Sequence, residues 1–295
     1  MKKLGRALII ILFGFLIFVT IFTSFKQSEQ IKNATEKNTS LYDSYGQFSS
    51  KDNGIAILCY HRISPSNDMT YFAQKNSNNS QLHSFNVNQK TFAKQMTYLK
   101  KQQIPVISLN EAVNLVKKGP IKKKYVVLTF DDIDQTIIDN ALPLLNKYHF
   151  PYTCFIITGQ MNQYLDGSYT ASTEQIQRLN RKFCTLGIHT NHLHYQKNNK
   201  PMLLQVSLSQ FKQDYEQAME TLNKVTHTKK SNYYFAPPYG AITKAEQQWL
   251  MKSKRTKGIL TLDDALFTHQ TPLSNIPRII VTDKSFNHIK QWLKK

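Results

Sequence analysis

Short apolar runs rich in β-branched residues alternate along this chain with segments whose apolar residues recur every three or four positions. The first pattern is typical of buried strands and the second of amphipathic helices. The predicted strands cover residues 55–60, 104–107, 126–130, 152–157, 184–188, 233–236, 258–262 and 279–281. The predicted helices carry their apolar residues at 92–99, 112–116, 137–145, 176–179, 211–222, 249–250 and 286–292. This alternation favours a parallel sheet covered by helices.

The alternation runs from residue 54 to residue 295, a length that suits one (β/α) barrel. We therefore expect a single domain at 54–295 with an irregular (β/α) barrel of about seven units, and a doubly wound open sheet is the alternative. Three helix starts carry predicted capping boxes: Ser108 with Glu111, Ser172 with Gln175, and Thr243 with Glu246.

Residues 1–28 have a different character. Basic residues at positions 2, 3 and 6 precede an apolar run at 7–22, which is typical of an export signal. An uncleaved membrane anchor is the alternative interpretation. Residues 29–53 are polar and predict a linker. Either interpretation places the domain outside the cytoplasm, secreted and retained at the cell wall or the outer face of the membrane.

The net charge of +19 changes the expected partners. A basic exported protein is attracted to anionic surfaces, so we expect an anionic cell envelope as a partner. No nucleic-acid motif is visible, so we expect no nucleic acid, and nothing indicates an obligate protein partner. The three scattered cysteines favour buried free thiols over a disulfide framework.

Titratable residues stand where predicted strands end. Asp131 and Asp132 follow the strand at 126–130, and His61 follows the strand at 55–60. Successive residues of a strand point in opposite directions, so the two aspartates are expected to do different jobs, one as a metal ligand and one as a base. The alternative is that one of them only caps the following helix.

Three histidines, His189, His192 and His194, lie within six residues after another strand. Imidazole is a common ligand of zinc-like ions. Two histidines and one aspartate with open positions for water make the ligand set of a hydrolytic metal site. We expect a divalent ion, zinc first, with cobalt and nickel as alternatives.

Residues 129–132 (Thr-Phe-Asp-Asp), taken with this histidine cluster, resemble the polysaccharide deacetylases of carbohydrate esterase family 4, the NodB homology domain. The resemblance implies that Asp131 is the catalytic base and that Asp132 and His189 bind the metal. Either His192 or His194 could supply the third ligand. We choose His194, because its spacing from His189 resembles the branch that deacetylates poly-β-1,6-N-acetylglucosamine.

His61 strengthens the resemblance to that branch. The family's catalytic-acid histidine usually follows the metal motifs, but the last predicted strand here is followed by no histidine. His61 matches instead, which implies a NodB-like barrel with circularly permuted motif order. Asp263, at the end of another strand, is expected to keep His61 charged; a helix or turn cap is its alternative role.

Residues 236–240 (Ala-Pro-Pro-Tyr-Gly) match the family's Arg-Pro-Pro-Tyr-Gly stretch except for Ala236. Either Arg278 or Arg62 is expected to replace the missing arginine. The backbone N–H of Tyr239 is the candidate donor to the oxyanion.

The resemblance as a whole implies metal-dependent N-deacetylation of N-acetylglucosamine residues in an exported biofilm polysaccharide, poly-β-1,6-N-acetyl-D-glucosamine. Peptidoglycan or chitin-type deacetylation is one alternative. A non-catalytic polysaccharide-binding protein on the same fold is another, and the missing arginine at Ala236 is its support.

Overall fold

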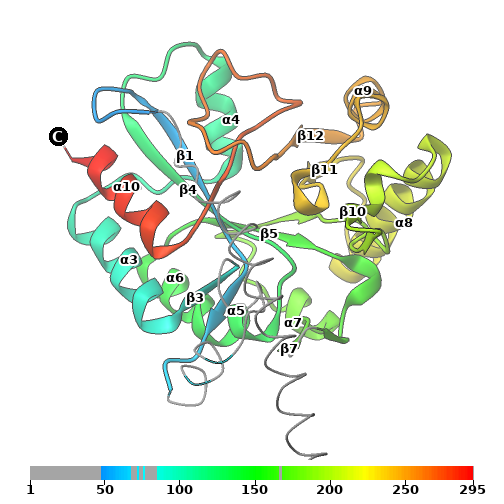
Figure 1. Ribbon diagram of the computed structural model, residues 1–295, viewed down its shortest axis with the longest axis horizontal. Coiled ribbons are helices and arrows are strands. Elements are labelled where there is room, and N and C mark those ends of the chain that lie inside the picture. The colour runs from blue at the N-terminus through cyan, green and yellow to red at the C-terminus, as the bar shows by residue number, and fades with distance from the viewer. Residues whose placement is uncertain (1–47, 68–71, 73–75, 77–84, 166–167, 295) are drawn as a thin grey trace, which may run out of the picture.

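Seven parallel strands form the central sheet of the protein (Figure 1). The computed structural model describes residues 48–67, 72, 76, 85–165 and 168–294. In order across the sheet, the strands are β12 (Thr256–Ile259), β11 (Tyr233–Phe235), β8 (Cys184–Ile188), β5 (Tyr152–Ile156), β4 (Lys124–Phe130), β1 (Gly54–Tyr60) and β13 (Ile279–Ile280). Every residue of β1 is buried, as expected where both faces of a parallel sheet are covered.

The sheet curls into a half-barrel. A single parallel bridge joins Leu260, just after β12, to Ile276, just before β13. In chain order, β1 is the first strand of this sheet and β13 is the last, and the two lie side by side. Leu58 pairs with Ile279, and Cys59 pairs with Ile280. The expected irregular barrel of about seven units is confirmed, and the open alternative is set aside.

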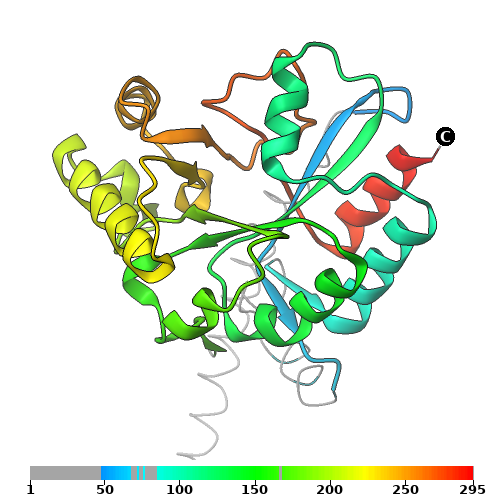
Figure 2. The same cartoon turned by 180° about the vertical axis from the view of Figure 1, so that it is seen from behind.

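Helices cover the outside of the curl, and one helix lies within it (Figures 1 and 2). The helices are α3 (Gln89–Lys101), α4 (Leu109–Lys117), α5 (Gln135–Asn140), α6 (Leu142–Tyr148), α7 (Thr173–Gln177), α8 (Leu208–Thr226), α9 (Lys244–Lys252) and α10 (Asp283–Leu293). Leu109 and Val113 of α4 join Ile57 and Val127 of the sheet in a separate apolar cluster on the inner face. The outer helices bury the larger core against the opposite face.

Short elements surround the carboxyl ends of the strands. Three two-stranded pairs are β2 (Arg62–Ser64) with β3 (Asn86–Asn88), β6 (Tyr164–Leu165) with β7 (Ser168–Tyr169), and β9 (Gln196–Lys197) with β10 (Lys200–Pro201). Three single turns of 3-10 helix are η2 (Thr158–Gln160), η3 (Met202–Leu204) and η4 (Pro238–Gly240). These elements line the edge where the site residues lie.

Local predictions met different outcomes. The three capping boxes are confirmed at the starts of α4, α7 and α9. The strand expected at 104–107 is wrong, because only Val106 forms a bridge there, to Val126. The helix expected around 137–145 is two helices, which meet at Ala141 just before Pro143. Proline lacks the N–H that a continuous helix needs at that point.

The predicted export signal or anchor at 1–28 lies outside the described residues, and so does most of the predicted linker at 29–53. Among the helices within the described ranges, none is long and apolar enough to cross a membrane.

Candidate active site

The carboxyl ends of β1, β4 and β8 carry the predicted site residues. His61 follows β1, Asp131 and Asp132 follow β4, and His189 follows β8. In a parallel sheet these ends share one edge, so the fold brings together groups that are far apart in the sequence. The backbone of Asp132 is left-handed, with φ of 64°, and this sharp turn gives the two adjacent carboxylates different partners.

Asp132, His189 and His194 form one cluster. The Oδ1 atom of Asp132 lies 3.4 Å from Nε2 of His189 and 3.1 Å from Nε2 of His194. One ligand atom from each residue lies within 4.8 Å of the other two. His192, the alternative to His194, instead packs its ring beside Gly159 and donates its backbone N–H to Asp214.

The protonation of His189 indicates that this cluster fits a cation. Its Nδ1 lies 2.6 Å from the carbonyl oxygen of Ala236, which can only accept, so Nδ1 carries the proton. Nε2 of His189 therefore faces the carboxylate of Asp132, whose Oδ1 is buried. Burial raises the pKa of Asp132, but His194 and His189 outweigh it and hold that pKa well below its usual range. Three converging donor atoms, with the other ring nitrogen of His189 bound to a backbone carbonyl, make an arrangement that fits a metal ion. Asp132, His189 and His194 are called the metal triad below.

Asp131 has a different environment. Arg278 donates from Nη1 to Oδ1 at 2.6 Å and from Nη2 to Oδ2 at 2.8 Å. Both side chains are buried, and Cys59 Sγ lies 3.5 Å from Oδ2. Burial raises the pKa of Asp131, but Arg278 and the nearby histidines outweigh it and lower that pKa to about 2. Asp131 is therefore a fixed, ionised carboxylate.

Arg278 thus occupies the role left open by Ala236. Of the two arginines considered from the sequence, Arg62 pairs with Asp134 at 3.1 Å, and Arg278 is the one that binds both oxygens of Asp131. Arg278 immediately precedes β13, which lies beside β1, and its guanidinium also stacks over the ring of Phe155. Arg278, which lies just before β13, therefore makes up for the arginine that the family motif has at the position of Ala236.

His61 lies beside Asp131 at the end of β1. Its Nε2 is 4.0 Å from Oδ2 of Asp131, and its ring packs at 4.7 Å against Phe85. Burial lowers the pKa of His61, and the attraction of Asp131 does not restore it to the ordinary value.

The expected pairing of Asp263 with His61 needs correction. Asp263 is exposed and accepts hydrogen bonds from Thr261 and Asn275, both at 2.7 Å. Both donors to Asp263 are side chains of residues that follow β12, and His61 is not one of them. Within the described ranges, the carboxylate paired with His61 is Asp131.

Tyr239 reaches the site through η4. Its backbone is left-handed, with φ of 59°, and its ring stacks on His194 at 5.4 Å. The side chain is 37% exposed, so it forms part of the rim beside the metal triad. Its role as an oxyanion donor remains a prediction.

Comparison with known proteins identifies the family. Residues 118–254 match the family described as polysaccharide deacetylase. The chain is 31% identical to the poly-beta-1,6-N-acetyl-D-glucosamine N-deacetylase of Staphylococcus aureus N315, over 97% of both chains. The chain belongs to the polysaccharide deacetylase family. The chain is also 30% identical to the poly-beta-1,6-N-acetyl-D-glucosamine N-deacetylase of Staphylococcus epidermidis, over 81% of this chain and 83% of that one.

Solved structures agree with the fold of this deacetylase. IcaB from Ammonifex degensii superposes with a TM-score of 0.70 at 27% identity, covering 83% of this chain and 98% of that chain. The Streptococcus pyogenes deacetylase PplD, solved in complex with acetate, superposes with a TM-score of 0.65 at 22% identity, covering 82% of this chain and 99% of that chain. The second match supports the fold alone.

Sequence reasoning missed two residues that support the site of this deacetylase. Asp214 of α8 accepts from the backbone N–H groups of Asn191 and His192 at 2.8 and 2.7 Å, which fixes the loop that carries the metal triad's histidines. Cys59 contacts Asp131 from the end of β1. Asp214 is buried next to Tyr215 on the inward face of a helix, and a carboxylate at such a position is the signal that could have revealed it.

Replacing His194 by alanine should remove metal binding, because it deletes one of three protein ligands. The loss of affinity should exceed the roughly 10–100-fold that follows the loss of an outer partner. His192→Ala is the matched control and should bind metal as the unmodified protein does. Metal content after zinc loading, measured by mass spectrometry, distinguishes them; the opposite ranking of the two variants would refute the ligand assignment.

Proposed function

We propose that this polysaccharide deacetylase removes acetyl groups from the N-acetylglucosamine units of exported poly-β-1,6-N-acetylglucosamine, with a divalent ion held by the metal triad. The observation that carries the proposal is the pairing of a fixed, ionised Asp131 with an adjacent set of two histidines and one aspartate. The near full-length relationship to deacetylases named for this polymer supports the substrate.

The residues present suit hydrolysis of an amide. Zinc fits a triad of two imidazoles and one carboxylate, with cobalt and nickel as alternatives. A bound ion of this kind polarises the acetamide carbonyl and lowers the pKa of a neighbouring water. Asp131 accepts a proton from the attacking water, and Arg278 holds both of its oxygens in place.

The leaving amine needs a proton when the C–N bond breaks. We assign its delivery to His61, which lies 4.0 Å from Asp131. Burial lowers the pKa of His61 and so favours its neutral form. The proton that it delivers therefore originates in the attacking water and arrives by way of Asp131, so the protons balance. The backbone N–H of Tyr239 is our candidate donor to the oxyanion.

The linkage of the sugars is the sharpest test of this function. Acetate release should be faster with β-1,6-linked N-acetylglucosamine oligomers than with β-1,4-linked ones, and Asp131→Asn should abolish it with both. A preference for β-1,4 oligomers would replace the proposal with a peptidoglycan or chitin-type activity. Binding of oligomers with no acetate release by the metal-loaded protein would favour the non-catalytic alternative, which the Asp131–Arg278 pair now opposes.

We further propose that the protein is exported and retained at an anionic envelope. The apolar run at 7–22 after a basic start and the net charge of +19 support this location. Cell fractionation should recover the protein with the envelope. Washing the envelope with about 1 M salt should release a form whose signal has been cleaved, because at that concentration charges are screened within roughly 3 Å. Recovery in the cytoplasm would contradict the proposal.

A further inference from the structure

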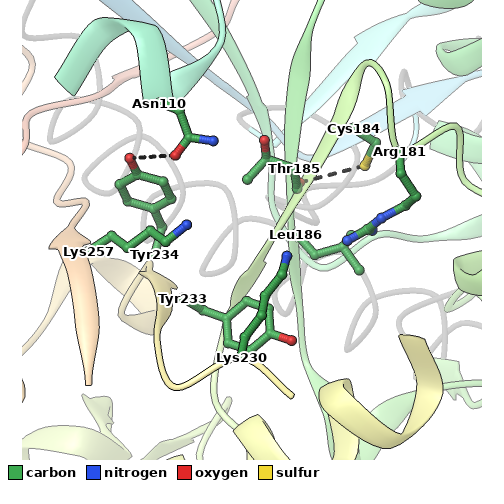
Figure 3. Close-up of a pocket in the computed structure, with 9 residues that line it drawn as sticks. All are labelled: Asn110, Arg181, Cys184, Thr185, Leu186, Lys230, Tyr233, Tyr234 and Lys257. Atoms are coloured by element: carbon green, nitrogen blue, oxygen red, sulfur yellow. Dashed lines mark hydrogen bonds between the residues drawn. The ribbon is translucent and has the colours of Figure 1, made fainter. Parts of the chain in front are cut away.

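A pocket of about 210 Å³ lies at the opposite end of the sheet from the active site (Figure 3). Its walls include Cys184 and Tyr233, which begin β8 and β11, and Lys257 near the start of β12. His189 follows Thr185 of the pocket by four residues, a span of about 13 Å at 3.3 Å per strand residue. A ligand in this pocket therefore does not touch the reacting groups.

Three cationic side chains line this pocket: Arg181, Lys230 and Lys257. No carboxylate is among the lining residues. In the part of the chain that the structure describes, none of the ion pairs involves any of the three. Figure 3 shows the two lysine ammonium groups and the guanidinium extending toward the same space. The pocket thus concentrates positive charge without a protein counterion.

The lysines are held in place by their surroundings. The ammonium of Lys230 lies 5.3 Å from the ring centre of Tyr233, and that of Lys257 lies 5.8 Å from the ring centre of Tyr234. Asn223 of α8 also bonds the backbone of Lys230 twice, at 2.9 and 3.0 Å. These contacts restrict where the charges can move, which reduces the entropy lost on binding a ligand.

Neutral donors complete the lining. Asn110 accepts a hydrogen bond from the hydroxyl of Tyr234 through Oδ1 at 3.1 Å, which leaves its amide N–H groups to donate. Figure 3 shows that nitrogen on the side of Asn110 where Thr185 lies, and Thr185 adds a hydroxyl. The pocket is therefore rich in donors for an oxyanion with several oxygens.

We propose that this pocket binds a phosphate group. Inorganic phosphate or a phosphate monoester carries about −1.5 to −2 at pH 7 and presents at least three oxygens, which match three cations and two neutral donors better than the two oxygens of a carboxylate do. Burial lowers the pKa of Lys230, and Arg181 and Lys257 lower it further, so the cations repel one another and an anion relieves that repulsion. Bound there, the phosphate of a surface would orient the catalytic edge away from that surface.

The volume and the positive charge of the pocket exclude large ligands and cationic ones. Its volume is below the roughly 300–1,000 Å³ of pockets for drug-sized molecules, so it suits one small group. If the proposed function holds, the deacetylated product carries ammonium groups, which this pocket repels. The pocket is therefore not a binding subsite for that product.

The test is calorimetric titration of inorganic phosphate at low ionic strength into the whole protein and into the double variant Lys230→Gln with Lys257→Gln. Each lost charge-assisted contact should weaken binding about tenfold. Lys290→Gln is the matched control, because Lys290 makes the same kind of contact with the ring of Tyr98 at 5.4 Å but lies on α10. Arg181→Gln is an independent second variant, and unchanged acetate release by every variant verifies folding.

Phosphate binding that is lost in the double variant and in Arg181→Gln but kept in Lys290→Gln supports the proposal. Equal affinity in the pocket variants and the unmodified protein overturns it, and so does an absence of saturable binding. A second arm identifies the source of the phosphate, using vesicles that contain phosphatidic acid, whose headgroup is a phosphate monoester, against vesicles of phosphatidylcholine. If the protein sediments with the anionic vesicles, and this sedimentation is lost in the pocket variants and displaced by inorganic phosphate, the ligand is a lipid headgroup. If the pocket variants sediment with these vesicles as much as the unmodified protein does, the ligand is free phosphate.

Discussion

Replacing Arg278 by methionine should lower the free energy of unfolding by about 3–5 kcal/mol and abolish acetate release. Arg278 and Asp131 are both buried and joined by two hydrogen bonds, so removing the arginine leaves a buried carboxylate without its partner. Asp131 would then take up a proton at neutral pH and cease to act as a base. Urea unfolding measures the first effect, and acetate release from the metal-loaded protein measures the second.

Two further variants separate charge from geometry. Arg278→Lys keeps the charge but cannot hold both oxygens of Asp131, so it should retain more stability than activity. The double variant Asp131→Asn with Arg278→Met removes both charges and should recover much of the lost stability while remaining inactive. An Arg278→Met protein as stable as the unmodified one would contradict this account of the pair.

The same pair predicts how stability depends on pH. Because the folded pKa of Asp131 is about 2, below its ordinary value of 3.8, its contribution to stability is fully present above about pH 4. That contribution is lost as the pH falls from about 4 toward 2. In Asp131→Asn, denaturation midpoints should therefore vary less over this acid range, which urea titrations at each pH would measure.

Replacing His61 by alanine should lower turnover by roughly 10²–10⁴ while leaving folding and metal binding intact. His61 lies 4.0 Å from Asp131 and contributes no atom to the metal triad, so its loss removes a proton donor and no ligand. Steady-state acetate release with β-1,6 oligomers measures the effect, and zinc content verifies the metal site.

His269→Ala is the matched control for His61, because His269 is an exposed histidine outside the site. It should turn over normally. Near-normal turnover of His61→Ala would refute both the assignment of the acid and the permuted order of motifs. Loss of zinc in His61→Ala would show that the histidine supports the metal triad instead.

The periodicity of the chain predicted the sheet well, because each strand is a local apolar run. The same locality explains the site residues that were placed correctly at strand ends: Asp131, Asp132 and His189 end or follow strands whose position is evident from the sequence. In a parallel sheet, such ends share one edge whatever the order of the strands.

Long-range partners could not be read in this way. Arg278 reaches Asp131 from 147 residues away, and the sequence offered Arg62 as an equal candidate. The choice depends on β13 lying beside β1, which is set by the order of the strands in the sheet. Asp263 failed for the complementary reason: it follows a strand in sequence, but the turn after β12 directs it to Thr261 and Asn275.

The position of β13 also sets the order in which the site can be completed. Asp131 is in the middle of the chain, whereas its buried counterion, Arg278, immediately precedes β13. A polypeptide that leaves the ribosome or crosses a membrane with its N-terminus first has the metal triad's residues available long before residue 278. The proposed base is therefore held in place only after β13 docks beside β1, so a chain cut short before Arg278 would carry the metal triad's residues without an oriented Asp131.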